Sequence, residues 1–105
     1  MAGYAKVWVN FLSTEQGGRR APIYLGADGP GLYRPHFRVR GGNGEYLGIE
    51  FVDGPTDWVK PGDSADAAVH FVYEPTVCYD ALAVGAEFDV LEGSRVVGVG
   101  HVTRR

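Results

Sequence analysis

Five arginines are the side chains of this sequence best suited to chemistry with an anion. A guanidinium group donates paired hydrogen bonds to phosphate or carboxylate oxygens, so a cluster of them predicts a phosphate-facing surface. The alternative is a solvated face whose cations pair with Glu15 or Glu45, because surface ion pairs contribute only ~0–1 kcal/mol and need no function. Both interpretations stay open for Arg19, Arg20, Arg34, Arg38 and Arg40.

Residue types that catalyse reactions or hold metals are present without a recognisable pattern. His36, His70 and His101, even with Cys78 as a fourth ligand, match no standard zinc spacing. The serines lie outside any nucleophile-elbow sequence, and Cys78 is expected to be packed or half-exposed. The phosphate loop GxxxxGK[ST] is missing from the sequence. We therefore predict no catalytic residues, no metal, no cofactor and no bound nucleotide.

Six short runs with alternating polarity would position these side chains. In the first run Val7, Val9 and Phe11 share one face, and Trp8 shares the other with Lys6 and Asn10. No window shows a convincing helical repeat, and sixteen glycines and six prolines interrupt the chain at short intervals. The pattern predicts an all-β sandwich or small barrel. The runs are Tyr4–Leu12, His36–Arg40, Tyr46–Val52, Ala67–Tyr73, Glu87–Leu91 and Arg95–Thr103.

Glycine pairs and tryptophans make further predictions. Gly17 and Gly18 are expected to supply the positive φ of a tight turn, so that Gly18→Val would destabilise it. Gly93 with the following serine is expected to turn the last hairpin. Trp8 is an interface candidate if its face is exposed, and Trp58 is expected to cover an opening of the barrel.

Length and composition favour one ordinary globular domain over residues 1–105. Acidic residues exceed basic ones by 13 to 10, giving a net charge of −3, whereas nucleic-acid binders usually carry a basic excess. A single cysteine permits no internal disulfide and fits a reducing compartment. No apolar run approaches the ~18 residues that a membrane helix needs. These features predict a cytoplasmic protein that does not bind membranes.

Four segments resemble the third, C-terminal domain of elongation factor Tu, in the same order and at similar spacing along nearly the whole chain. They are EQGGRRAP at Glu15–Pro22, YRPHF at Tyr33–Phe37, KPGD at Lys60–Asp63 and LEGSRVVGVG at Leu91–Gly100. The resemblance implies a six-stranded antiparallel Greek-key barrel. It also implies surfaces for the stem of aminoacyl-tRNA, for a GTPase domain and for a nucleotide-exchange factor.

The resemblance transfers binding roles to particular positions, and the sequence departs from the family at others. The implied tRNA-facing residues are Arg19, Arg20, His36, Glu45 and Glu92 with Gly93. Together with Arg34, Arg38 and Arg95, these positions give the candidate binding set, which is Arg19, Arg20, Arg34, His36, Arg38, Glu45, Glu92, Gly93 and Arg95. Glu87 and Leu91 stand where the family typically carries arginine, which removes phosphate contacts.

Two functions of different class follow from these observations. The first is a non-catalytic module that engages a protein partner, such as a component of the translation machinery that it regulates, mimics or inhibits. The second is a domain that binds tRNA or structured RNA weakly through Arg19, Arg20, His36 and Arg38. The missing GTPase domain, the net negative charge and the two lost arginines favour the protein partner.

Overall fold

The computed structural model describes residues 3–105, and this part of the chain forms six β-strands without a helix. It therefore has no helix that could span a membrane. All six predicted strands are present, and the largest displacement of an end is at β4, which begins at Ser64 rather than Ala67. The strands are β1 Tyr4–Phe11, β2 His36–Val39, β3 Leu47–Asp53, β4 Ser64–Phe71, β5 Glu87–Glu92 and β6 Arg95–Arg104.

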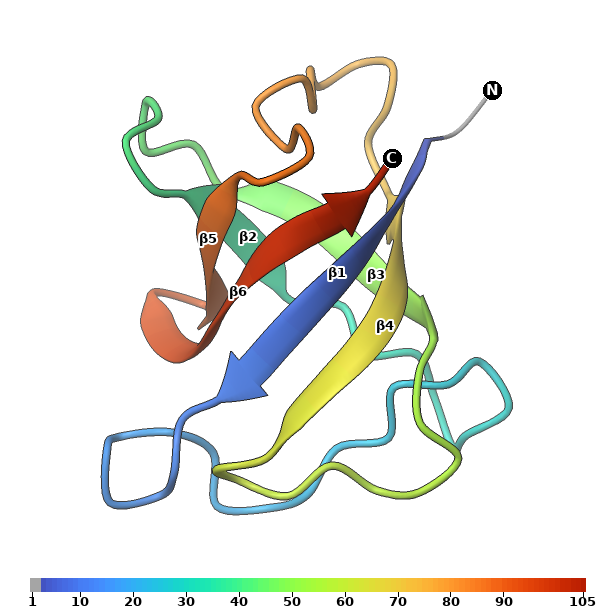
Figure 1. Cartoon of the computed structure of the whole chain (residues 1–105), viewed down its shortest axis with the longest axis vertical. Coiled ribbons are helices and arrows are strands. Elements are labelled where there is room, and N and C mark those ends of the chain that lie inside the picture. The colour runs from blue at the N-terminus through green and yellow to red at the C-terminus, as the bar shows by residue number, and fades with distance from the viewer. Residues whose placement is uncertain (1–2) are drawn as a thin grey trace.

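The strands close into one antiparallel barrel in the order β1-β4-β3-β2-β5-β6 (Figure 1). Strands β2, β3 and β4 follow one another as neighbours, and the long connection from β1 to β2 places β1 beside β4. This arrangement is a Greek key, as the sequence predicted. Strand β2 is the shortest, with four residues, and pairs with β3 only through His36↔Gly48 and Phe37↔Leu47.

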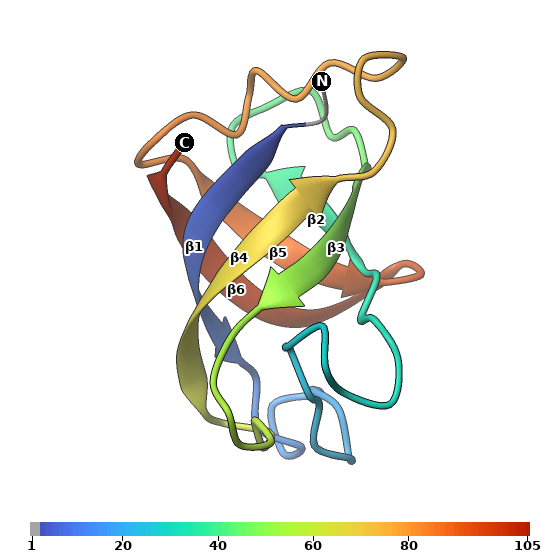
Figure 2. The same cartoon turned by 90° about the vertical axis from the view of Figure 1, so that its right-hand side faces the viewer.

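The two ends of the barrel differ in which connections they carry (Figure 2). The connections β1–β2 and β3–β4 lie at one end, which we call the lower end. The β5–β6 turn, which projects sideways in Figure 2, belongs to the same end, because Arg95 beside it contacts the β1–β2 connection. The connections β2–β3 and β4–β5 lie at the other, or upper, end, where the described chain also starts and finishes. Because the long β1–β2 connection belongs to the lower end, this end carries most of the irregular surface.

The core fills the inside of the barrel with the inward residues of every strand. Val7, Val9 and Phe11 are buried, which confirms the predicted alternation in β1. Phe37 of β2 stacks on Phe88 of the neighbouring strand β5, with ring centroids 3.8 Å apart. Such aromatic pairs contribute ~0.5–1.5 kcal/mol beyond the area that they bury.

The segment between β4 and β5 covers the upper end. Its Tyr79 is fully buried, stacks on Phe71 at 4.6 Å and donates a hydrogen bond of 2.6 Å to the carbonyl of Gly48. The same hydroxyl accepts the backbone N–H of Tyr73 at 3.2 Å. One tyrosine therefore joins the covering segment to strand β3, and its polar atom is satisfied inside the core.

The first glycine turn differs from its prediction in one respect. Gly17 has φ +90°, but Gly18 has no positive φ, so the predicted reason for the second glycine was wrong. Gly18 is needed for space: a Cβ there would lie 2.1 Å from the carbonyl oxygen of Leu12. Gly93 does have a positive φ, +61°, and begins a two-residue turn between β5 and β6, as predicted.

Candidate binding surface at the lower end

The four segments singled out from the sequence meet at the lower end of the barrel. Arg95, just after the β5–β6 turn, donates hydrogen bonds to the carbonyls of Gly17 and Gly18. The backbone N–H of Gly62, in the β3–β4 connection, donates to the carbonyl of Phe11, the last residue of β1, at 2.9 Å. Segments that are up to 78 residues apart in sequence are thus held side by side. The lower end is the part of the fold that these motifs build.

A charged cluster stands at the centre of this end. The Glu92 carboxylate forms an ion pair with the guanidinium of Arg19. It also accepts a hydrogen bond of 2.5 Å from the hydroxyl of Tyr33. The Tyr33 ring is stacked on Phe51 of the core at 5.5 Å, and the Arg19 guanidinium lies 5.6 Å from the ring centroid. Burial, the hydrogen bond to Glu92 and the charge of Glu92 together raise the pKa of Tyr33 well above its ordinary value. Tyr33 is therefore neutral at physiological pH and anchors the ion pair to the core.

An open groove of about 320 Å³ adjoins this cluster. Its lining combines apolar side chains with polar surface and comes from the β1–β2 and β3–β4 connections. Trp58 is 49% exposed and Leu32 is 42% exposed, so two large apolar side chains face solvent in one place. Gathered apolar surface of this kind is typical of interaction sites. The groove is lined by Arg19, Pro22, Ile23, Tyr24, Pro30, Gly31, Leu32, Tyr33 and Trp58.

Trp58 does not cover a barrel opening, contrary to the prediction. The residue that closes this part of the lower end is Val59, which is buried and bridges Ile23 through two backbone hydrogen bonds of 2.8 Å. Alternation along the chain then turns Trp58 outward. There its ring lies roughly perpendicular to that of Tyr24, with the two ring centroids 5.6 Å apart. The sequence could not distinguish the inward from the outward member of this pair, because both are apolar.

A second set of predicted residues lies on the outer face of β2. Arg38 and Arg40 both reach the carboxylate of Asp89, at 3.1 Å each, so two cations share one acid. The ring of Tyr46 covers this face, 6.0 Å from the ring of His36 and 5.9 Å from the Arg38 guanidinium. The face therefore presents two cations that share one carboxylate beside an exposed aromatic ring.

The predicted binding set thus divides rather than forming one patch. Arg19, Glu92, Gly93 and Arg95 come together at the lower end, and Arg20 is exposed on the same connection. His36 and Arg38 lie along β2, and Arg34 pairs with Glu50 at 3.2 Å. Glu45 is exposed in the β2–β3 connection at the upper end.

The carboxylates that pair with the arginines are not the ones suggested by the sequence. Glu15 and Glu45 form none of the ion pairs of residues 3–105; Glu50, Asp89 and Glu92 do. All three acids lie on strands, Glu50 on β3 and the other two on β5, and Asp89 is directly opposite Arg38 across the sheet, a relation that the chain order hides. Leu91, where the resemblance implies an arginine, is fully buried beside a bulge in β5. That position presents no side chain to a ligand.

Tyr24, Leu32 and Tyr46 were missed as surface residues by the sequence reasoning. Each is a large apolar residue in a connection, outside the regular strands. Leu32 directly follows the glycine- and proline-rich stretch 26–31, where no inward face exists to receive it. Apolar residues flanking such a loop are the signal that would have found the groove.

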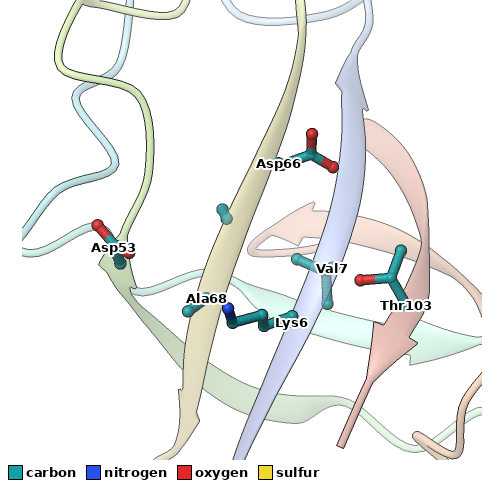
Figure 3. A pocket seen from close by; sticks show the side chains of 7 residues that line it. Lys6, Val7, Asp53, Asp66, Ala68 and Thr103 are labelled. Carbon is teal, nitrogen blue, oxygen red and sulfur yellow. The ribbon is translucent and has the colours of Figure 1, made fainter.

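A further groove, of about 240 Å³, lies on the outside of the barrel between β1, β4 and the end of β3 (Figure 3). The Lys6 side chain extends over Ala68. The groove is also lined by Asp53 on β3, by Asp66 nearer the start of β4 and by Thr103 on β6. Within residues 3–105 no ion pair joins Lys6 to either carboxylate. The charges there are solvated, and small side chains form its floor.

The histidines and the cysteine are dispersed over the fold. His70 faces outward beside Glu50 at 3.6 Å, as its alternation predicted, and His101 stacks on Trp8 at 5.4 Å. Trp8 is therefore on the outer face, half-buried rather than free. Cys78 is exposed at the upper end, more than predicted. Over the described range, 3–105, no three His, Cys, Asp or Glu side chains are grouped so as to hold a metal ion.

No protein-family model matches the chain. The surface of the molecule is therefore the basis on which its function is inferred.

Proposed function

We propose that this chain is a non-catalytic binding module that engages a protein partner through its lower end. The observation that carries the proposal is the groove bounded by Tyr24, Leu32 and Trp58, where two large apolar side chains are between 42% and 49% exposed. Aromatic residues are enriched at protein interfaces because they bury large area at little conformational cost. The groove adjoins a charged cluster, which supplies the polar rim of such a site.

The state of the arginines also supports a protein partner over RNA. Arg19, Arg34, Arg38 and Arg40 each lie against a carboxylate, so a phosphate would have to compete with an existing ion pair. A phosphate that binds a paired arginine releases fewer counterions than a phosphate that binds a free cation. Arg95 is engaged by two backbone carbonyls. The resemblance to the elongation-factor barrel suggests the translation machinery as the setting of the partner.

The test is affinity capture with matched surface variants. Trp58→Ala should abolish recovery of a specific partner from an extract of the source organism. Tyr4→Ala should not, because Tyr4 is similarly exposed, at 56%, but belongs to the start of β1 at the upper end. Equal recovery by both variants, at equal thermal stability, would refute the lower end as the docking surface.

RNA binding remains the second candidate, and the face of β2 is the observation that favours it. Arg38 and Arg40 share one carboxylate beside the exposed ring of Tyr46, on which a base could stack. A titration of labelled tRNA at low and near-physiological salt tests it. Salt-sensitive binding that is lost in Arg19→Glu/Arg20→Glu, or in Tyr46→Ala, would promote this candidate.

A further inference from the structure

The aromatic corner of the lower-end groove is built before any ligand arrives. The rings of Tyr24 and Trp58 meet edge to face at 5.6 Å with an interplanar angle of 62°. The loop 26–31 folds against Tyr24 so tightly that a Cβ at Gly29 would lie 2.3 Å from its Cδ2 atom. At Gly26 a Cβ would lie 2.9 Å from the Cε2 atom of the same ring. Tyr24 is thus fixed by its loop, which lowers the entropic cost of using it as a binding wall.

The charge beside this corner is negative. The Asp28 carboxylate lies next to the Tyr24 ring, since a Cβ at Gly26 would approach both of them closely. The hydrogen bond to Asp28, burial, and the charges of Asp28 and Asp57 all raise the pKa of Tyr24. Asp57 accepts the backbone N–H of Trp58 at 2.9 Å, which holds its carboxylate at the base of the tryptophan.

Arg19 is the one cation among residues 3–105 that lines the groove, and it is already neutralised. Arg19 lies against Glu92, whereas Asp28 and Asp57 form none of the ion pairs found in residues 3–105. The groove therefore presents an exposed indole ring and a tyrosine wall, and two carboxylates without ion-pair partners adjoin this corner from outside the lining. This combination attracts a cation and repels a phosphate.

We propose that the groove binds an exposed segment of the partner protein in which an arginine or lysine lies next to an apolar residue. The cation rests on the face of Trp58 with Asp28 and Asp57 as its counter-charges, and the apolar neighbour packs on Leu32, Pro22 and Pro30. A volume of about 320 Å³ is small for a ligand pocket and accommodates one or two side chains. The inference rests on the proposed function, because it names the chemistry of the partner that the module engages.

The test uses the two tryptophans of the chain as internal reporters. The probe is the peptide acetyl-Gly-Pro-Leu-Arg-Pro-Leu-Gly-amide, with counterparts in which glutamine or glutamate replaces arginine. The indole N–H signals of Trp8 and Trp58 are followed by NMR at low salt and assigned with Trp8→Phe. The arginine peptide should shift the Trp58 signal saturably and leave Trp8, on the outer face of β1, unmoved.

Variants separate the cation from general apolar contact. Backbone amide signals of the groove report the affinity of the Trp58 variants, which lack the reporting indole. Trp58→Phe should keep most of the affinity, whereas Trp58→Leu should weaken it about fivefold, since an exposed cation–π contact accounts for a factor of that order. Asp28→Asn/Asp57→Asn keeps both hydrogen-bond acceptors and removes both charges, so it should weaken binding by at least about threefold. Equal shifts with the arginine, glutamine and glutamate peptides would overturn the proposal, as would no shift at millimolar arginine peptide.

The outcomes also separate this inference from the proposed function. If the peptide does not bind but partner capture still requires Trp58, the basic segment is refuted and the module stands. If the peptide binds as expected but no capture depends on Trp58, the chemistry of the groove is supported and the proposed function falls.

Discussion

At the scale of single residues, Tyr33 determines how the lower end is held. Its ring stacks on Phe51 inside the barrel, and its hydroxyl donates a hydrogen bond to Glu92 at the surface. Through Glu92 it fixes Arg19, which lines the groove. A polar contact of this kind transmits the rigidity of the core to a surface that would otherwise depend on a long connection.

Tyr33→Phe should change how stability depends on pH. The pKa of Tyr33 is raised in the folded protein above the value of about 10 for an unfolded tyrosine, so its stabilisation is complete below pH 10 and is lost as the pH rises beyond it. Between the two pKa values, the proton that folded Tyr33 keeps and unfolded Tyr33 releases lowers the free energy of unfolding by about 1.4 kcal/mol per pH unit. Urea unfolding between pH 8 and 11 should therefore give a shallower alkaline loss for Tyr33→Phe than for the wild type. Parallel curves would show that Tyr33 is not held neutral.

Gly18→Ala should destabilise the domain for steric reasons. The added methyl group would lie 2.1 Å from the Leu12 carbonyl oxygen, and crowding of this kind typically costs about 1–3 kcal/mol. Gly31→Ala is the matched control, because nothing lies within 4 Å of a Cβ there, and its effect should stay within about 0.5 kcal/mol. Thermal unfolding of both variants checks the difference. Equal melting temperatures would mean that the turn relaxes freely.

At the scale of elements, the strands were predictable and the connections were not. Alternation in β1 and β4 predicted which residues face inward, because burial on one side of a sheet gives a period of two. The connections follow no such period, so the outward position of Trp58 and the ion-pair partners of the arginines escaped prediction. The motifs at Glu15–Pro22 and Lys60–Asp63 indicated turns correctly, but only the closed barrel shows that the first contacts Arg95 and the second contacts the end of β1.

Tyr79→Phe tests whether the β4–β5 segment is tied to the barrel as described. Removing the hydroxyl leaves the Tyr73 N–H without its partner and the Gly48 carbonyl with the Val72 N–H alone, which should cost about 1–3 kcal/mol. Hydrogen exchange in the covering segment should accelerate, while exchange in β1 and β6 follows only the global loss. Tyr46→Phe is the control, since Tyr46 is 41% exposed. Similar losses in both variants would place the closure elsewhere.

At the scale of the whole molecule, the distribution of charge decides between the two candidate functions. The net charge is −3, and most arginines of the predicted surface lie against carboxylates. A tRNA titration should accordingly show weak binding with a logarithmic salt slope no steeper than about −2, as expected for about two neutralised phosphates. A slope of about −4 or steeper would require more free cations than the surface offers.

The most direct measurement is photocrosslinking in the source cells from position 58. A benzophenone side chain replaces Trp58 there, and the matched protein carries it at Tyr4, on the upper end. Position 58 should give discrete adducts that resist ribonuclease and are destroyed by protease, and position 4 should give none of them. Adducts that ribonuclease removes, or identical adducts from both positions, would contradict a protein-docking surface at the lower end of the barrel.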